Sequence, residues 1–178
     1  MKRAIVLVTL LSNLAFADPL IGDFRMPNVV LDAIKHCECL KDNGVCNPYV
    51  IRINADEDIA KALDQGYAVN GHLIRCNSSQ ECVDQTQSLI VSGIVNLDLG
   101  PYQINYKYHP NPNLSEYFDF DQSREKANTI LTKLVKSFGY SWETLGRYHH
   151  SPVNPEKNAS YYRKMIAYID SNSKKDLK

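Results

Sequence analysis

The chain lacks the compositional features of a nucleic-acid-binding or non-globular protein. Its 178 residues include 20 basic and 20 acidic side chains, so the formal net charge is zero. Phosphate binding requires a surplus of Lys and Arg on one face, and this balance therefore argues against a nucleic-acid partner. With 8 Gly, 8 Pro and no internal repeat, the chain is neither collagen-like nor of low complexity. Its length and its 44% hydrophobic content indicate one folded domain.

Long hydrophobic runs are also missing outside the N-terminus. Lys2 and Arg3 precede an apolar stretch over residues 4–14, and Ala15-Phe16-Ala17 has the small-x-small pattern of a cleavage site. This order predicts a secretory signal peptide over residues 1–17 and an exported mature protein. The stretch is too short to span a bilayer. An N-terminal anchor is the alternative, but we expect no stable membrane insertion.

Five cysteines are present, and no two of them form a Cys-x-x-Cys pair. In an exported protein disulfides are the default. Cys39 with Cys46 and Cys76 with Cys82 would close short loops and leave Cys37 as a buried thiol, but connectivity cannot be deduced from sequence alone. A zinc site is the alternative. Because His36 and His72 do not stand at finger spacing, we expect no metal and no other cofactor.

The pattern of apolar residues predicts a mainly α fold of the α+β type. The domain is expected over residues 18–170, followed by a flexible tail over residues 171–178. A small β-hairpin is predicted over Tyr67–Arg75 around Asn70-Gly71, and residues 96–109 look irregular. Helices are expected after Pro27, over residues 56–65, from Ser78 to Gly93, from Asp121 or Ser123 to Gly139, after Ser141, and from Asn154-Pro155 onwards.

Glu38 is the first candidate for chemistry. It stands four residues after Ile34 and eight after Val30, so it ends the apolar stripe of the first predicted helix. A carboxyl group on that stripe is partly desolvated, which favours its protonated form and suits a general acid. Two structural explanations compete with this one: a buried Glu held by a hydrogen bond, and a Glu that turns outward to water at the helix end.

Three further motifs follow Glu38 in a distinctive order. Asn47-Pro48-Tyr49 comes first, Asn96-Leu97-Asp98-Leu99-Gly100-Pro101-Tyr102-Gln103-Ile104-Asn105 lies midway, and Ser141-Trp142-Glu143 leads into Gly146, Tyr148 and His149. The order resembles that of the lytic transglycosylases with the soluble lytic transglycosylase domain, over roughly residues 27–169. Within that family the chain is most similar to the small members associated with secretion systems.

This resemblance implies a fold like that of goose-type lysozyme and a periplasmic enzyme without a cofactor. Glu38 matches the single catalytic acid, Gln103 a sugar-contacting glutamine, and Tyr148 the tyrosine that hydrogen-bonds the acid; Tyr102 and Asn105 would line the same groove. The family cleaves the β-1,4 bond between N-acetylmuramic acid and N-acetylglucosamine in peptidoglycan without water and leaves a 1,6-anhydro end. The implied partners are peptidoglycan strands and an envelope-spanning secretion apparatus.

The chain departs from the family pattern around Glu38. Cys39 replaces the usual Ser, residues 39–46 lengthen the connection to Asn47-Pro48, and residues 55–85 form an insertion. Most glycosidases use two carboxylates, but the sequence offers no second candidate in a context comparable to that of Glu38. A catalytically weak glycan-binding or assembly module and a hydrolytic muramidase are the alternatives. A hydrolytic triad is disfavoured, because no Ser or Cys nucleophile arrangement surrounds His149 and His150.

Overall fold

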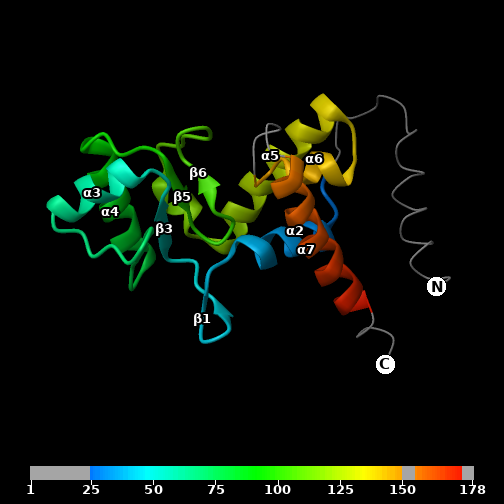
Figure 1. Cartoon of the computed structure of the whole chain (residues 1–178), viewed down its shortest axis with the longest axis horizontal. Helices are drawn as coiled ribbons and strands as arrows, with labels where there is room; N and C mark the ends of the chain where they lie inside the picture. Colours follow the sequence, from blue (N-terminus) through cyan, green and yellow to red (C-terminus); the bar gives the residue numbers. More distant parts are fainter. Residues whose placement is uncertain (1–24, 150–154, 174–178) are drawn as a thin grey trace. The chain divides into compact units, whose positions relative to one another are not determined.

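The structure is a computed structural model that describes residues 25–149 and 155–173. The predicted signal peptide, the predicted cap at Asn154 and residues 174–178 of the predicted tail lie outside these ranges. The helices are α2 (Asn28–Glu38), α3 (Asp56–Asp64), α4 (Ser79–Val91), the 3-10 helix η2 (Leu114–Tyr117), α5 (Phe120–Phe138), α6 (Trp142–Gly146) and α7 (Pro155–Ser173) (Figure 1). The strands are β1 (Lys41–Asp42), β2 (Val45–Cys46), β3 (Val50–Ile53), β4 (Leu73–Arg75), β5 (Leu97–Leu99) and β6 (Ile104–Asn105). This is a mixed α+β chain in which helices dominate.

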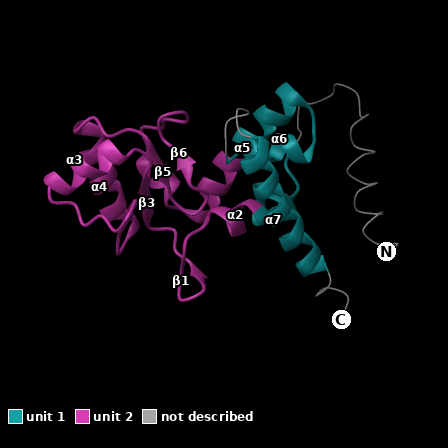
Figure 2. Ribbon diagram, viewed as in Figure 1, with its two compact units in different colours: residues 1–33, 128–178 teal, residues 34–127 magenta. Residues whose placement is uncertain are grey.

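The chain divides into two compact units, which Figure 2 shows in different colours. Unit 1 comprises residues 1–33 and 128–178, and unit 2 comprises residues 34–127. Both division points fall inside helices, one in α2 and one in α5. Because ordinary helical sequence runs through both points, with no Pro- or Gly-rich linker, nothing in the composition indicates the division.

A four-stranded antiparallel sheet lies in unit 2, in the order β4-β3-β5-β6. Successive side chains of a strand point to opposite faces. On one face, Ile51 lies opposite Ile74 of β4 and Leu99 of β5, and Leu99 lies opposite Ile104 of β6. All four side chains are buried. The apolar face of the sheet is therefore part of the core of unit 2, together with Leu89 of α4, Ile94, Tyr117 and Phe118.

The sheet corrects two predictions from the sequence. The predicted hairpin over Tyr67–Arg75 is only a tight turn, closed by a single bridge between Asn70 and Leu73, because β4 pairs with β3 instead. Residues 96–109 are not irregular throughout, since they contain β5 and β6. Strands this short give only a weak alternating pattern, and β4 pairs with a strand that lies far from it along the chain.

Most of the predicted helix ends are confirmed. Oγ of Ser78 accepts a hydrogen bond from the Glu81 amide at 3.2 Å, and Oγ of Ser141 accepts one from the Thr144 amide at 3.1 Å. These are N-cap contacts. The predicted start of α5 at Asp121 or Ser123 is wrong, because Oδ1 of Asp119 accepts hydrogen bonds from the amides of residues 121 and 122. Helix α7 also runs to Ser173, three residues into the predicted tail.

Unit 1 is built from the first part of α2, the second part of α5, and helices α6 and α7 (Figure 2). Its buried apolar residues are Met26, Val30, Leu31, Ala33, Leu131, Val135, Leu145, Tyr161, Met165 and Ile169. The Met26 amide donates to Oδ1 of the buried Asn128 at 2.9 Å, which joins the N-terminal segment to α5. Helices α6 and α7 approach closely, since a Cβ at Gly146 would lie 3.1 Å from the Asn158 carbonyl oxygen.

Candidate functional site

A row of polar side chains crosses the second face of the sheet in unit 2. Arg52 of β3 lies opposite Asp98 of β5, and Asp98 lies opposite Asn105 of β6. Directly opposed residues share a face, so the three side chains are neighbours. All three are half-buried, whereas their neighbours Ile53, Leu97 and Leu99 along the strands are fully buried. The register of the sheet thus gathers charged and amide groups at one place.

Asp98 is the centre of this row. Its Oδ1 accepts a hydrogen bond from Nδ2 of Asn105 at 2.7 Å, and the Asn54 side chain also hydrogen-bonds to it. Burial raises the pKa of the Asp98 carboxyl group above its ordinary value; the two amides and the Arg52 charge lower it, and the Glu38 charge raises it further. The net shift is upward. The surroundings therefore disfavour the ionised form of Asp98 in spite of its hydrogen bonds.

The side-chain oxygen of Asn105 is an unsatisfied acceptor in this row. Its Nδ2 donates both to Asp98 and to Oδ1 of Asn96, the second bond at 3.0 Å. Its own Oδ1 is buried and accepts no hydrogen bond from the part of the chain that the structure describes. Buried acceptors are nearly always satisfied by protein or water. This oxygen is therefore an unsatisfied acceptor beneath the surface of the row.

Gln103 joins the row through Arg52. Nε of Arg52 donates to Oε1 of Gln103 at 3.4 Å, and Nε2 of Gln103 donates to the Gly100 carbonyl at 2.8 Å. The backbone of Gln103 has a φ of +45°, a region that residues other than Gly seldom adopt. Strained residues of this kind are concentrated at functional sites. The turn between β5 and β6 therefore holds Gln103 in place at a cost to stability.

Glu38 is the last residue of α2 and is half-buried. Its charge contributes to the raised pKa of Asp98, so the two carboxyl groups lie within electrostatic range of each other in unit 2. The sequence offered no second carboxylate in a context comparable to that of Glu38, and Asp98 is the acid whose surroundings the charge of Glu38 reaches. Asp98 lies inside the midway motif, between Leu97 and Leu99, in the segment predicted to be irregular. The alternation of apolar and polar residues over 97–99 was the signal that could have identified it.

Tyr102 does not fit its predicted role. The resemblance implied that its ring lines the groove, but only 1% of the residue is exposed. Burying an aromatic ring of this size contributes strongly to a core. Tyr102 is thus a buried core residue within the β5–β6 turn, and the prediction that its ring lines a substrate groove is wrong.

Tyr148 lies in the turn that follows α6 and belongs to unit 1, whereas Glu38, Gln103 and Asn105 belong to unit 2. The side chain of Tyr148 is half-buried. Its turn is attached to α7, because the ring of His149 stacks on that of Tyr161 with the ring centres 4.6 Å apart. The hydrogen bond expected between Tyr148 and Glu38 joins residues of different units and stays a prediction.

Two disulfides hold the loops around the sheet. Cys39 is bonded to Cys46 across the β1–β2 hairpin, and Cys76 is bonded to Cys82 between the end of β4 and α4. These are the local pairings expected from the sequence. Cys37 is in neither disulfide, and it is half-buried rather than buried as expected. The first disulfide closes the lengthened connection between Glu38 and Asn47-Pro48.

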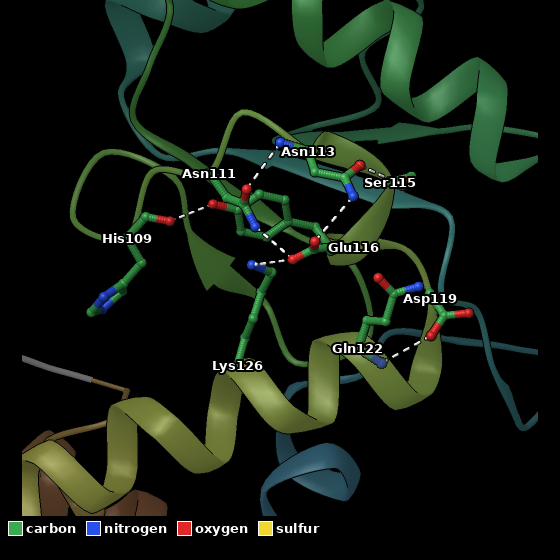
Figure 3. A network of polar contacts seen from close by, with 9 residues as sticks. His109, Asn111, Asn113, Ser115, Glu116, Asp119, Gln122 and Lys126 are labelled. Carbon is green, nitrogen blue, oxygen red and sulfur yellow. Dashed lines mark hydrogen bonds and ion pairs between the residues drawn. The ribbon is translucent and has the colours of Figure 1, made fainter.

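A polar network holds the segment that follows β6 (Figure 3). Glu116 accepts hydrogen bonds from Nδ2 of Asn111 at 2.6 Å and of Asn113 at 3.0 Å, and Nζ of Lys126 lies 2.7 Å away. The hydrogen bond from Lys126 is the main cause that lowers the pKa of Glu116. The hydroxyl of Tyr117 donates to the His109 carbonyl. These contacts fix the backbone of Tyr117, against which the β5–β6 turn packs.

The remaining features of the described residues add no second site. They contain no group of three or more His, Cys, Asp or Glu side chains that could hold a metal ion. Within the same ranges, no helix combines the length and the apolar character that a membrane span needs. Compared with protein-family models, with curated proteins and with solved structures, the chain shows no significant match. The family resemblance therefore rests on the sequence motifs alone.

Proposed function

We propose that this protein is a peptidoglycan lytic transglycosylase of the periplasm, exported by a signal peptide over residues 1–17. The observation that supports the proposal most is the gathering of motif residues in unit 2. Gln103 and Asn105 both contact the row of Arg52 and Asp98, and the charge of Glu38 reaches the same Asp98. These residues are spread over most of unit 2 in sequence, so their meeting is a property of the fold.

In the proposed reaction Glu38 acts first as an acid and then as a base. It protonates the oxygen that links N-acetylmuramic acid to N-acetylglucosamine, and the bond to the anomeric carbon breaks. The resulting carboxylate takes the proton from the C6 hydroxyl of the same muramic acid residue as that oxygen attacks the anomeric carbon. The products are a 1,6-anhydro end and a free hydroxyl on the leaving sugar, with no water consumed. Because the nucleophile is attached to the substrate, the step gains an entropic advantage of up to roughly 7 to 11 kcal/mol.

The half-buried polar row suits the binding of a sugar. Pyranose rings present hydroxyl and acetamido groups, which can accept hydrogen bonds from the half-buried side chain of Arg52. The goose-lysozyme-like architecture is part of the same proposal. A mainly helical chain with a small antiparallel sheet, one helix of which ends in a half-buried Glu, is compatible with that architecture.

The test is the digestion of purified sacculi by the wild type and by Glu38→Gln, with mass spectrometry of the released fragments. The wild type should release anhydro ends. A single acid and base group typically contributes about 100- to 10,000-fold to a rate, so Glu38→Gln should lose turnover by that factor. A suitable control is Glu57→Gln, the same change at an exposed position in the first turn of α3.

Each other outcome supports a different function. Release of reducing ends would identify a hydrolytic muramidase. Intact glycan that nevertheless co-sediments with the protein would identify a catalytically weak binding module. Normal release of anhydro ends by the Glu38→Gln protein would rule out the assigned role of Glu38.

A further inference from the structure

Arg52 of β3 carries more hydrogen-bond donors than its contacts with the described residues use. Its side chain is half-buried on the polar face of the sheet. A guanidinium group has five N–H donors and no acceptor. Nε is committed to Gln103, whereas the terminal Nη groups form no hydrogen bond or ion pair within the part of the chain that the structure describes. Because the side chain is only half-buried, these donors are available to a ligand.

Gln103 holds the guanidinium group of Arg52 in place. Oε1 of Gln103 accepts from Nε of Arg52 at 3.4 Å, and Nε2 of Gln103 donates to the Gly100 carbonyl at 2.8 Å. Both ends of the Gln103 amide are thus engaged within the protein. The family resemblance implies that this amide contacts the sugar. In this chain the amide instead supports Arg52, which has the uncommitted donors.

The charges around Arg52 decide which acceptor suits it. Asp98 lies directly opposite Arg52, and the charge of Glu38 reaches Asp98. Two carboxyl groups near one cation disfavour a further anion, such as a carboxylate of the peptide stem, because like charges repel. A neutral carbonyl oxygen has lone pairs and no proton, so it can accept from both Nη groups at once. The 2-acetamido groups of peptidoglycan sugars supply such an oxygen.

On the basis of the function proposed above, we propose that Arg52 binds the 2-acetamido carbonyl of a sugar next to the cleaved bond and thereby selects N-acetylated glycan. Arg52 is the specificity-determining residue, and Gln103 is a positioning residue that acts through it. Removing the acetyl group leaves an ammonium group at neutral pH, which offers no acceptor and repels the guanidinium group. The recognition makes and breaks no covalent bond, so the proposed reaction is unchanged.

The experiment measures one ratio for each protein: kcat/KM on N-acetylated glycan strands divided by kcat/KM on chemically de-N-acetylated strands. Hydrogen bonds to a charged group are among the stronger ones, so the wild-type ratio should be about 10 or more. Arg52→Gln should lower the ratio by about tenfold or more. The ratio is independent of the fraction of folded protein, because both substrates meet the same preparation. A merely structural role of Arg52 would therefore leave it unchanged.

Two further variants complete the experiment. Arg163→Gln is the matched control, the same change at an exposed position of α7 in unit 1, and it should keep the wild-type ratio. Gln103→Met offers Nε of Arg52 only a weak acceptor, so it should lower the ratio by at least about threefold. If Arg52→Gln does not fold, Gln103→Met decides the matter, and an unchanged ratio then overturns the inference.

The role of Arg52 and the proposed function can fail separately. An Arg52→Gln ratio within about threefold of the wild-type ratio overturns the role of Arg52, and so does a wild type that cleaves both kinds of strand equally well. In both cases the release of anhydro ends by the wild type leaves the proposed function intact. A wild type that releases no fragments from either kind of strand overturns the proposed function and the role of Arg52 together.

Discussion

At the scale of single residues, the surroundings of a carboxyl group decide what it can do. Asp42, Asp98 and Glu116 all lie in unit 2 and all accept hydrogen bonds from amide side chains. The first and the last also meet a cation directly, and the pKa of each is lowered. The cation nearest to Asp98, Arg52, donates its hydrogen bond to Gln103 instead. Burial and the charge of Glu38 raise the pKa of Asp98. The same chemical group is thus a structural ion-pair partner in two places and a candidate for chemistry in the third.

The raised pKa of Asp98 predicts how stability depends on pH. The folded protein holds the Asp98 proton up to a higher pH than the unfolded chain, whose value is near the ordinary 3.8. Stability is therefore lost as the pH rises from the ordinary value through the raised one. Asp98→Asn removes this loss, so its melting temperature relative to the wild type should be higher at pH 7 than at about pH 3.

Calorimetry of the wild type and of Asp98→Asn at about pH 3 and at pH 7 measures this difference, in which the contributions of acids that do not interact with Asp98 cancel. Glu116 has a lowered pKa and shows the opposite sign, since its contribution is present at neutral pH and lost on acidification. Its pair with Lys126 provides the internal comparison. A relative melting temperature of Asp98→Asn that falls as the pH rises would mean that Asp98 is a stabilising ion-pair partner.

At the scale of elements, the β5–β6 turn shows why the motif contains Gly100. Its φ is +71°, and a Cβ at this position would lie 1.8 Å from the Tyr117 carbonyl oxygen. The backbone of Tyr117 cannot yield easily, because the network around Glu116 and the hydrogen bond to His109 hold this segment (Figure 3). The turn that places Gln103 and Asn105 therefore depends on the absence of a side chain at residue 100.

Gly100→Ala should lower the free energy of unfolding by about 2 to 4 kcal/mol, from the positive φ and the overpacking together. The matched control is Gly71→Ala, which has a φ of +61° but nothing within 4 Å of the added Cβ. The control should lose only about 1 kcal/mol. Urea unfolding of both variants measures the two values. Equal losses would show that the contact with Tyr117 contributes nothing.

At the scale of the whole molecule, all five cysteines belong to unit 2, where two disulfides surround the sheet. Unit 1 relies on packing among its helices instead. Each disulfide closes a loop of six or seven residues, which in the chain-entropy model stabilises the fold by about 2 to 3 kcal/mol. Unit 2 is thus cross-linked at the β1–β2 hairpin and at the start of α4, as suits an exported protein.

The disulfides give a direct prediction for the intact protein. Alkylation of the denatured, non-reduced protein should add one label, at Cys37, and five labels after reduction. Replacing Cys76 and Cys82 together by Ala should lower the free energy of unfolding by about 2 to 3 kcal/mol. Peptide mass spectrometry locates the labels. Labelling of several cysteines before reduction would contradict the pairing.

The helices could be predicted from the sequence because their signals are local. Ser78, Ser141, Gly93 and Gly139 act on residues only a few positions away, and these ends were predicted correctly. The cap of α5 was misplaced because Asp119, Asp121 and Ser123 are all good N-cap residues in one short stretch. Glu38, Gln103 and Asn105 could be named as candidates from motif spacing, which is also a property of the linear chain.

Contacts between distant segments could not be read from the sequence. The pairing of β4 with β3 joins residues that are far apart along the chain, and so does the electrostatic interaction between Glu38 and Asp98. The burial of Tyr102 likewise depends on the core around its turn. The sequence by itself determines which residues can form a helix, because helical hydrogen bonding and capping act over a few residues. It also determines which residues match a motif, because a motif is a spacing along the chain. Only the tertiary structure decides which of them share a face, because that depends on strand register and on the core that the strands cover.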